Sequence, residues 1–318
     1  MDKVRIGFIG CGGFSTGAVY PALHHAPVDL VAVCDLNENL AKRNAKWFGA
    51  DRFYTDRRRM YDQEELDAIF IITGPGGHYP LSIEAMERGY HVFIAKPPAN
   101  TLEETAAMLK KSEATGKFLM INFQRRFGDA AQMAKKIMDS EAFGAPTHIQ
   151  SKFCSGHYAS EESYLRDFAI HHFDLIRHFM GDIETVYAVR NLTDNQASFA
   201  VSLKFKNGAV GGMHLSSQQL WGKKYDRIEI TGEENYVILD GLWRMEHYAK
   251  DGNHFWEPSP DHRSQFLTGD AYAVRHFAES IINNTQPISN IRDGYEAMKL
   301  VKVLHEKAGE IVCLDEIT

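Results

Sequence analysis

The segment from Val4 to Asp35 constrains the fold of this chain more than any other part of the sequence. A short apolar run, Val4 to Ile9, leads into a glycine-rich turn, and a second apolar run, Leu30 to Cys34, ends at Asp35. Continuous apolar runs of this length are typical of buried parallel strands. The order of strand, glycine turn, helix, strand and acid is the arrangement that binds dinucleotides in doubly wound α/β folds.

The glycines of this turn have separable roles in holding a dinucleotide. Gly10 makes the tight turn after the strand, and Gly12 lets the backbone approach a pyrophosphate, which the free N–H groups of the next helix would meet. A serine replaces the third glycine of the pattern G-x-G-x-x-G and is small enough to keep the helix close to the strand. A glycine run after a strand can also be only a turn. We expect the cofactor to lie against Gly10, Gly12, Gly13, Phe14 and Ser15.

The acid at the end of the second strand bears on which dinucleotide is bound. Asp35 would accept hydrogen bonds from the hydroxyls of the adenosine ribose, and its charge would repel a 2′-phosphate. The sequence therefore favours NAD over NADP.

The composition sets the class of protein and its partners. Of the 318 residues, 44% are hydrophobic and 24% are charged, and the formal net charge is −7, which is ordinary for a soluble globular protein. We expect no nucleic-acid partner, since the basic runs are short. We expect no signal peptide, because a strand is expected within a few residues of the N-terminus, and no apolar run reaches the roughly 18 residues that cross a membrane.

The four cysteines are scattered along the chain without the C-x-x-C spacing of a metal site. Neither a disulfide framework nor a zinc site is expected from this pattern, which fits a reducing compartment. We therefore expect a cytoplasmic protein.

The chain is expected to divide into two domains, residues 1–122 and residues 123–318. In the first, apolar strands alternate with helices, of which the clearest are expected at Glu38–Phe48, Tyr79–Arg88 and Thr101–Ser112. Such alternation predicts an α/β fold with a Rossmann-type, doubly wound parallel sheet.

The second domain shows a different pattern. Between Ala197 and Phe205 apolar residues occupy every second position, and shorter segments with similar alternation lie on both sides. Helices are expected at Asp129–Asp139 and Asp167–Met180. The pattern predicts an α+β domain with a large, mostly antiparallel open sheet. A sheet face left uncovered by helices is a natural surface for dimerisation.

Lys96 is the first candidate for chemistry. The predicted strand His91–Ala95 runs directly into Lys96, Pro97 and Pro98. Ligands of open α/β sheets bind outside the carboxyl ends of the strands, which places Lys96 where a nicotinamide and its substrate would meet. Either proline bond could be cis and so fix the direction of the lysine. The alternative is a solvated lysine without a role.

A second candidate is a polar stripe on the helix that begins at Asp167. At 100° per residue, Asp167, His171, Asp174 and His178 fall within about 60° of one another. A carboxylate one turn from an imidazole can orient it and suit it to general acid–base catalysis. The alternative is a solvated polar face. No histidine or cysteine spacing supports a metal site.

Two further segments are placed to meet ligands. The stretch from Thr73 to His78 is rich in glycine, follows an apolar strand and should form a loop over the cofactor, unless it is simply a turn. Arg125 and Arg126 follow the last strand of the first domain. Either could bind substrate, and an interdomain ion pair is an equal alternative for Arg126.

Taken in order, these motifs resemble the glucose–fructose oxidoreductase / inositol dehydrogenase / MocA family. The resemblance covers nearly the whole chain and depends on the ordered set of motifs. These are I-G-F-I-G-C-G-G-F-S at the start, A-V-C-D at Asp35, I-I-T-G-P-G-G-H at His78, G-Y-H-V-F-I-A-K-P at Lys96, N-F-Q-R-R-F after Ile121, and D-x-x-x-H-x-x-D from Asp167.

The resemblance implies a Rossmann domain, an α+β domain whose open sheet mediates oligomers, and a catalytic lysine, aspartate and histidine. These map onto Lys96, Asp167 and His171. It also implies a substrate pocket lined by Gln124 and Arg125, with Lys96 and His171 contacting the reacting group. Residues Thr73, His78, Lys96 and Pro97 are the remaining matches to the cofactor site.

Two positions depart from the family pattern. Alanine replaces the glutamate that usually precedes Lys96, and the sequence Ser163-Tyr-Leu-Arg-Asp167 replaces a glycine-rich stretch. A substrate therefore does not follow from the resemblance.

The expected function is hydride transfer between NAD and a secondary hydroxyl or carbonyl of a sugar, polyol or sugar derivative. A homodimer or homotetramer through the second domain is expected. Two alternatives stay open: a non-catalytic NAD-binding sensor of sugar or redox state, and an enzyme that processes glycosides through transient oxidation.

Overall fold

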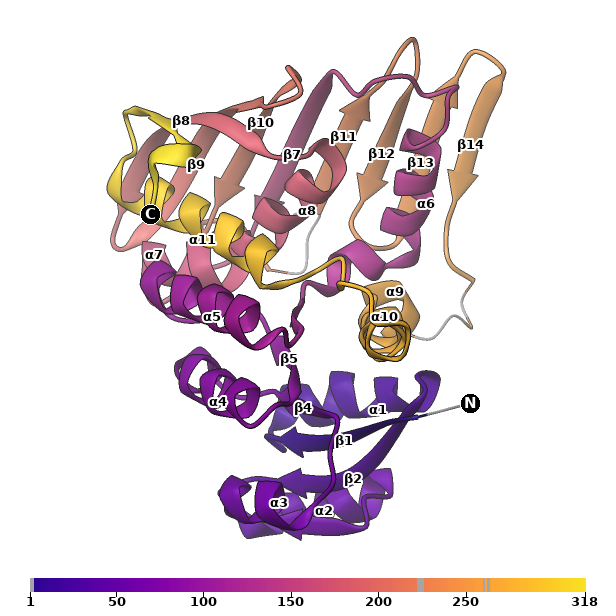
Figure 1. The fold of residues 1–318 in the computed structure, drawn as a ribbon. Helices are drawn as coiled ribbons and strands as arrows, with labels where there is room; N and C mark the ends of the chain where they lie inside the picture. Colours follow the sequence, from indigo (N-terminus) through magenta and orange to yellow (C-terminus); the bar gives the residue numbers. More distant parts are fainter. Residues whose placement is uncertain (1–2, 222–225, 260, 262–263) are drawn as a thin grey trace. The chain divides into compact units, whose positions relative to one another are not determined.

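The computed structural model describes residues 3–221, 226–259, 261 and 264–318. The chain forms two compact units (Figure 1). Unit 1 comprises the residues up to Gln124 together with Gly269–Tyr295, and unit 2 comprises Arg125–Thr268 together with Glu296–Thr318. The division predicted from the sequence, at residue 122, left the segment 269–295 with the second part of the chain.

The described residues of unit 1 form a six-stranded parallel sheet with the order β3-β2-β1-β4-β5-β6. This confirms the doubly wound fold predicted from the strand–helix alternation. The order reverses between β1 and β4, and ligands of such sheets bind at this switch point. The strands are β1 Val4–Ile9, β2 Val28–Cys34, β3 Arg52–Tyr54, β4 Ala68–Ile71, β5 His91–Ala95 and β6 Leu119–Asn122.

The helices of unit 1 cover this sheet. A π-helical turn, Ser15–Val19, follows the glycine turn and leads into α1, Tyr20–Ala22. The remaining helices are α2 Glu38–Phe48, α3 Arg57–Gln63, α4 Pro75–Glu87, α5 Leu102–Thr115 and α10 Asp270–Asn283.

One predicted helix begins earlier than the sequence indicated. The stretch from Pro75 to His78 was expected in a loop, but it forms the first turn of α4, with Gly74 as the N-cap residue. Proline is well suited to the first helical position, where its missing N–H has no partner to lose. Only Ile72, Thr73 and Gly74 therefore connect β4 to α4.

Helix α10 joins unit 1 through its apolar face. The ring of Phe277 packs edge-on against Phe70 and lies 5.4 Å from Phe93, centroid to centroid. The amide of Asn122 also donates to Asp270 at 2.8 Å. These buried contacts explain why a segment distant in sequence belongs to the first unit.

The described residues of unit 2 form a nine-stranded sheet with the order β14-β13-β12-β11-β7-β10-β9-β8-β15. Strands β7 and β10 pair in parallel, and the other neighbours pair antiparallel. The mostly antiparallel sheet predicted from the sequence is confirmed. Its strands are β7 His148–Cys154, β8 Ile183–Thr193, β9 Gln196–Phe205, β10 Val210–Ser216, β11 Asp226–Thr231, β12 Tyr236–Asp240, β13 Arg244–Ala249, β14 Gly252–Trp256 and β15 Ile311–Cys313.

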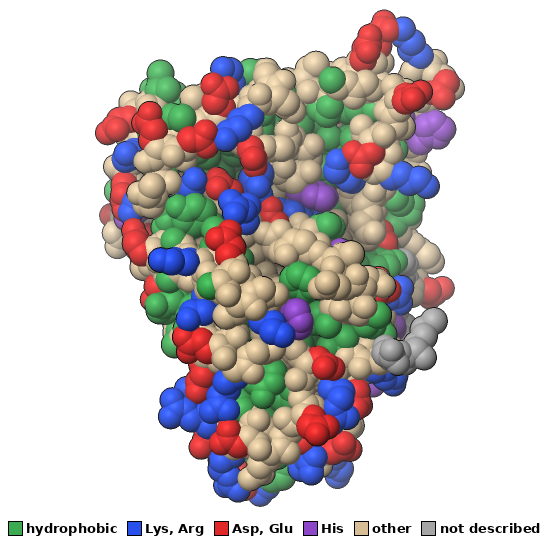
Figure 2. All heavy atoms as spheres, in the orientation of Figure 1, with side chains coloured by type: hydrophobic (Ala, Val, Ile, Leu, Met, Phe, Trp, Pro, Cys, Tyr) green, Lys and Arg blue, Asp and Glu red, His purple; other side chains and the backbone are tan. Residues whose placement is uncertain are grey.

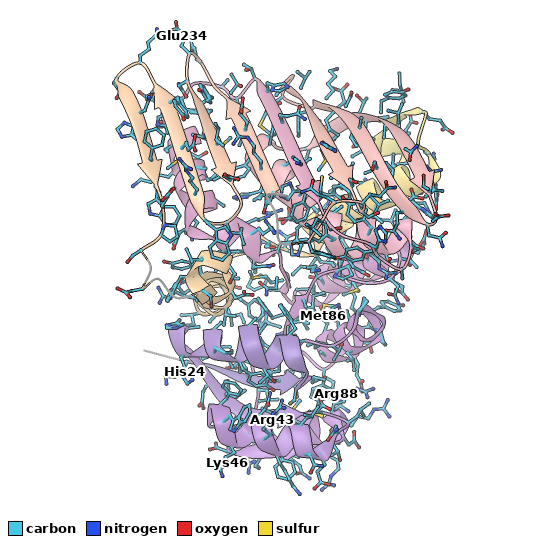
Figure 3. All side chains as sticks on the ribbon, turned by 180° about the vertical axis from the view of Figure 1, so that it is seen from behind. His24, Arg43, Lys46, Met86, Arg88 and Glu234 are labelled. Carbon is cyan, nitrogen blue, oxygen red and sulfur yellow. The ribbon has the colours of Figure 1, made fainter. Side chains whose placement is uncertain are left out.

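The two faces of this sheet differ. Helices α6 Asp129–Met138 and α8 Ile170–Met180 pack on one face (Figure 1). Seen from behind, the strands carry side chains with no helix of the described chain over them (Figure 3). Apolar groups are exposed on this open face, among them Tyr187, Val189, Val210 and Phe255. The open sheet predicted from the sequence is therefore present.

Surface charge and thiols agree with an ordinary globular protein. Acidic and basic side chains are interspersed over the face shown in Figure 2. All four cysteines are free. Burial raises the pKa of the Cys11 thiol to about 11 and that of Cys34 to about 12. Among the described residues, no helix combines the length and apolar character needed to cross a membrane.

Candidate dinucleotide and catalytic sites

The glycine turn after β1 has the geometry that its sequence predicts. Gly10 has φ +105°, and a Cβ atom at this position would collide with the carbonyl oxygen of Ile72. Cβ atoms added to Gly12 or Gly13 would meet no atom within 4 Å. The backbone conformation and the nearby carbonyl of Ile72 therefore require a glycine at position 10, whereas the space over Gly12 and Gly13 is open to a ligand.

The residues that follow the turn lie at its edge. Phe14 is 52% exposed. Ser15 is buried, and its hydroxyl donates to the carbonyl oxygen of Gly12 at 3.0 Å. The serine thus ties the first helical turn to the glycine turn, in the place where the motif usually has a third glycine.

Asp35 lies beside the turn with both carboxylate oxygens held. One accepts a hydrogen bond from the backbone N–H of Cys11 at 2.7 Å, and the other accepts from the N–H of Asn37 at 2.8 Å. A carboxylate has about four acceptor positions, so each oxygen keeps capacity for a ribose hydroxyl.

A pocket of about 410 Å³ opens between the ends of β1, β2 and β4 in unit 1. It contains both the tight-turn glycine and the ribose-binding candidate. Its lining residues are Ile9, Gly10, Cys34, Asp35, Leu36, Thr55, Asp56, Arg57, Thr73 and Leu81. Thr73, which the sequence analysis placed over the cofactor, is among these lining residues, and its contact with a cofactor stays a prediction.

These features fit NAD. The open space over the glycines accommodates a pyrophosphate close to the backbone, and Asp35 offers ribose acceptors at the rim of a partly apolar pocket that suits an adenine. The nicotinamide ring would supply the acceptor or donor of a hydride.

Arg43 was not anticipated from the sequence. From helix α2 its guanidinium donates to the carbonyl oxygen of Cys11 at 2.9 Å and to the hydroxyl of Thr16 at 3.1 Å. The arginine therefore fixes the glycine turn through the carbonyl oxygen of Cys11 and the hydroxyl of Thr16. The only sequence signal was a basic residue on the polar side of a helix next to the motif.

His78, in the first turns of α4, forms a buried contact with Pro97. The Nδ1 atom of His78 donates to the carbonyl oxygen of Pro97 at 2.8 Å. Burial lowers the pKa of His78, so the ring is neutral. The hydrogen bond from this fully buried ring holds Pro97, the residue that follows Lys96.

Lys96 lies at the carboxyl end of β5 and is half-buried. The Lys96–Pro97 bond is cis, one of the two possibilities left open by the sequence. The lysine thus stands at the edge of the sheet where ligands of doubly wound folds bind.

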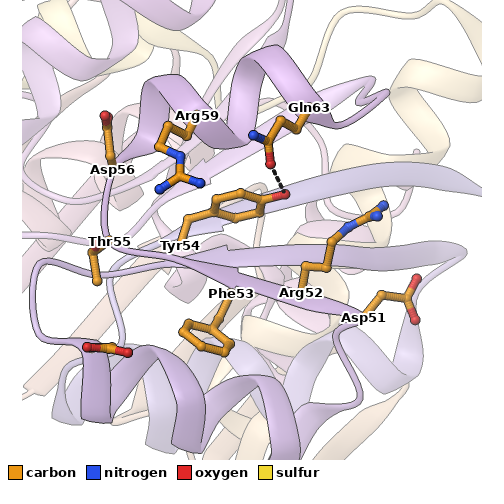
Figure 4. Close-up of a pocket in the computed structure, with 9 residues that line it drawn as sticks. Asp51, Arg52, Phe53, Tyr54, Thr55, Asp56, Arg59 and Gln63 are labelled. Atoms are coloured by element: carbon orange, nitrogen blue, oxygen red, sulfur yellow. Dashed lines mark hydrogen bonds between the residues drawn. The ribbon is translucent and has the colours of Figure 1, made fainter.

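A second hollow of unit 1, of about 510 Å³, lies beside β3 and α3 (Figure 4). Its lining mixes acids with arginines, and the Tyr54 hydroxyl lies 3.3 Å from the Gln63 side-chain oxygen and also bonds Glu64. It shares Thr55 and Asp56 with the pocket next to Asp35.

In unit 2, Asp167 and His171 lie on consecutive helical segments. Asp167 is in a π-helical turn, Leu165–Ala169, which continues into α8, where His171 is 8% exposed. The guanidinium of Arg166 holds both oxygens of Asp167, at 2.8 and 3.1 Å.

The predicted stripe of four polar residues is not maintained along the helix. Asp174 is almost fully buried, and its carboxylate accepts from Arg126 at 2.7 and 2.5 Å. This ion pair of Arg126 therefore lies within unit 2. The stripe assumed a uniform α-helix, whereas the π-helical turn changes the angular relation between Asp167 and the residues that follow.

Arg125 is buried and forms an ion pair with Asp226. The other oxygen of Asp226 accepts from Nε2 of His172 at 2.9 Å, and Nδ1 of His172 lies 2.7 Å from the hydroxyl of Ser151. The guanidinium also lies 4.6 Å from the ring centroid of Phe153. Sequence analysis missed this network of Arg125, Asp226, His172 and Ser151 because the four side chains come from four separate elements.

The protonation states in this network follow from its surroundings. Burial lowers the pKa of His172, so the ring is neutral; Nε2–H donates to Asp226, and the Ser151 hydroxyl donates to Nδ1. Burial alone would raise the pKa of Asp226, but the positive charge of Arg125 and the hydrogen bond from His172 lower it below its usual range. The carboxylate is ionised and fixes the direction of Arg125.

Gln124 begins a short 3₁₀ turn, Gln124–Phe127, and its side chain is half-buried. The described residues contain no group of three or more histidine, cysteine or acidic side chains placed to hold a metal.

Comparison with known families agrees with both halves of the chain. Residues 4–123 match the family described as "Oxidoreductase family, NAD-binding Rossmann fold", GFO_IDH_MocA. Residues 131–238 match the "GFO/IDH/MocA C-terminal domain".

Individual proteins are similar over most of their length. The chain is 27% identical over 278 residues to scyllo-inositol 2-dehydrogenase (NAD(+)) of Bacillus subtilis (strain 168), covering 81% of this chain and 80% of that one. A dehydrogenase from Chromobacterium violaceum superposes with a TM-score of 0.90 at 19% identity, over 97% and 96% of the two chains. Levoglucosan dehydrogenase in complex with NADH and L-sorbose gives 0.86 at 22% identity, over 99% of each.

The order of strands, the geometry of the glycine turn with Asp35, and the two family matches agree with one another. The chain belongs to the glucose–fructose oxidoreductase / inositol dehydrogenase / MocA family of oxidoreductases, and its N-terminal part is the NAD-binding Rossmann domain of that family.

Proposed function

We propose that the protein is an NAD-dependent dehydrogenase that acts on a secondary hydroxyl of a sugar, a polyol or a sugar derivative. The observation that carries the proposal is that a chain with a dinucleotide pocket also holds a nearly buried imidazole, His171, four residues after Asp167, whose carboxylate is fixed by Arg166. Relatives named for inositol and levoglucosan support this substrate class.

Three side chains are proposed to act on the reacting hydroxyl. His171 removes its proton as the carbon–hydrogen bond breaks and the hydride leaves for the cofactor, and the same imidazole returns the proton in reduction. Asp167 orients the imidazole and stabilises its charged form. Lys96 donates a hydrogen bond to the reacting oxygen, where negative charge develops.

Gln124 and Arg125 are proposed to bind the hydroxyls that do not react. Because Asp226 holds one end of the Arg125 guanidinium, the remaining N–H groups have a fixed direction. A rigid arginine loses little freedom on binding and can discriminate the arrangement of sugar hydroxyls.

The open face of the nine-stranded sheet is proposed to join subunits into a homodimer or homotetramer. Tyr236 and Tyr248 stack on this face at 4.8 Å, and the ring of Phe255 meets Tyr248 edge-on at 5.7 Å. Such a patch of aromatic and aliphatic groups is typical of a protein interface.

The test is NADH formation when the purified protein and NAD are mixed with a panel of polyols, aldoses and sugar acids, scyllo-inositol and levoglucosan among them. Lys96→Met is the control. A signal that the variant loses supports the proposal and identifies the substrate.

Two other outcomes point elsewhere. Tight binding of NADH without turnover across the panel would favour a non-catalytic sensor on the same scaffold. Consumption of a glycoside without net NADH would favour processing through transient oxidation.

A further inference from the structure

Arg166 stands next to the proposed orienting carboxylate and grips it with two nitrogens. Its Nε atom donates to one oxygen of Asp167 at 2.8 Å, and its Nη2 atom donates to the other at 3.1 Å. This is the forked geometry in which a guanidinium fixes both the position and the plane of a carboxylate. A lysine, with a single ammonium group, cannot reproduce it.

Adjacent residues of a helix do not normally face one another, since successive side chains point about 100° apart. The Arg166–Asp167 pair forms on a π-helical turn, Leu165–Ala169, where the helix is locally widened. Such single turns occur frequently at functional sites. The pair is therefore a feature of this particular turn and would not be expected on a regular α-helix.

The backbone beneath the pair is fixed from both sides. Tyr164, Leu165 and Ala169 have no exposed surface, and the Tyr164 hydroxyl donates to the carbonyl oxygen of Phe153 on β7 at 2.8 Å. The side chains of Arg166 and Asp167 remain partly accessible, at 19% and 32%. Two partly exposed polar side chains on a buried helical segment are the arrangement expected of a site that meets a ligand.

The fork leaves Asp167 able to act on a second group. A carboxylate has about four acceptor positions, of which Arg166 uses two. The pairing also stabilises the charged arginine, since the hydrogen bond to Asp167 raises the pKa of Arg166. Asp167 can thus remain oriented by Arg166 while it accepts from an imidazole.

We propose that Arg166 is a positioning residue of the reaction, which acts through Asp167 by fixing the orientation of its carboxylate toward His171. The inference rests on the proposed function, because it assigns Arg166 a place in that proton transfer. It gives a role to one of the two positions where the sequence departs from the family pattern.

The experiment compares three variants with the wild-type enzyme on the substrate identified above. Arg166→Met removes the charge and the fork but keeps most of the side-chain length, and Arg166→Lys restores the charge alone. Arg177→Met is the matched control, because Arg177 lies on α8 and forms a comparable ion pair, with Asp182 at 2.8 Å. Turnover, KM, the Kd for NADH and the midpoint of thermal unfolding are measured for each.

The expected result is a loss of kcat of roughly 10- to 100-fold in Arg166→Met, the range that misplacing a catalytic group costs. KM, the Kd for NADH and the thermal midpoint should stay close to wild type. Arg166→Lys should recover only part of the lost turnover, and Arg177→Met should retain wild-type turnover.

Other results would overturn the inference. Wild-type kcat in Arg166→Met would remove the positioning role, and so would a loss of kcat matched by Arg177→Met, which would indicate a general effect on the fold. Full recovery by lysine would show that charge alone matters. If Asp167→Asn and His171→Ala also kept wild-type turnover, the failure would belong to the proposed function and not to Arg166.

Discussion

The guanidinium of Arg43 and the carbonyl oxygen of Cys11 are joined by a hydrogen bond of 2.9 Å. Arg43 belongs to α2, which follows β2 in the sequence, whereas the glycine turn precedes β2. The hydrogen bond therefore links α2 to the glycine turn. The same side chain stacks over the ring of Trp47 at 5.0 Å. The backbone that would approach a pyrophosphate is therefore supported by a side chain outside the motif.

This support leads to a prediction for cofactor affinity. Arg43→Met should raise the Kd for NADH by about tenfold, which corresponds to about 1.4 kcal/mol, because the turn loses its brace and a nearby positive charge. Lys46→Met is the control, since Lys46 is exposed on the same helix (Figure 3). Titration of NADH fluorescence measures both, and equal affinities in the two variants would contradict the prediction.

The glycines of the turn should respond differently to alanine. Gly10→Ala should destabilise the protein by about 2 kcal/mol or more, since φ +105° is strained for any residue with a Cβ and the methyl would meet the carbonyl of Ile72. Gly12→Ala should change the unfolding free energy by less than about 0.5 kcal/mol, yet weaken NADH binding, because its methyl would occupy the open space.

Chemical denaturation and NADH titration of both variants separate these effects. A Gly12→Ala variant that bound NADH like wild type would show that the pyrophosphate does not approach the backbone there. A Gly10→Ala variant of unchanged stability would show that the turn can relax.

Much of the fold was predictable because its signals are local. Helix α2 has the predicted limits, since Asn37 caps it and Gly49 ends it in a left-handed conformation. The sheet of unit 1 followed from apolar runs between turn residues. Strands β13 and β14 were missed because charged residues such as Glu246 interrupt the alternation of apolar positions.

Site residues could be predicted from the sequence only where they belong to one local motif. Gly10, Asp35 and Thr73 line one pocket of unit 1, and the sequence could single them out because each follows a strand in a recognisable motif. The pairing of Arg125 with Asp226 joins residues 101 positions apart, and no local pattern reports such a contact. The π-helical turn at Asp167 was also hidden, since its residues are those of an ordinary helix.

Asp35 should control the choice between NAD and NADP. Asp35→Asn removes the charge that would repel a 2′-phosphate and keeps one oxygen to accept from a backbone N–H. The ratio of the Kd for NADPH to that for NADH should fall by about tenfold, or about 1.4 kcal/mol. An unchanged ratio would rule out the electrostatic argument, and wild-type protein that bound NADPH as tightly as NADH would rule out the NAD preference itself.

The buried His172 predicts a pH dependence of stability. Burial is the largest cause that lowers its pKa in the folded state, so the folded protein keeps the ring neutral while the unfolded chain takes up a proton below about pH 6.5. The stabilising contribution of the neutral ring is complete above this pH and decreases as the pH falls, by at most about 1.4 kcal/mol per pH unit for one proton.

His172→Asn should therefore lower the unfolding free energy at pH 7, because Asp226 and Ser151 lose their hydrogen bonds to the imidazole. The same variant should flatten the decline of the unfolding free energy between pH 6.5 and about pH 5. His24→Asn is the control, since His24 is exposed in unit 1 and lies outside the sheet that is proposed to join subunits (Figure 3). Urea denaturation of both variants at several pH values gives the two slopes. The assignment of a neutral, doubly hydrogen-bonded His172 fails if its variant declines with pH as steeply as the wild-type protein.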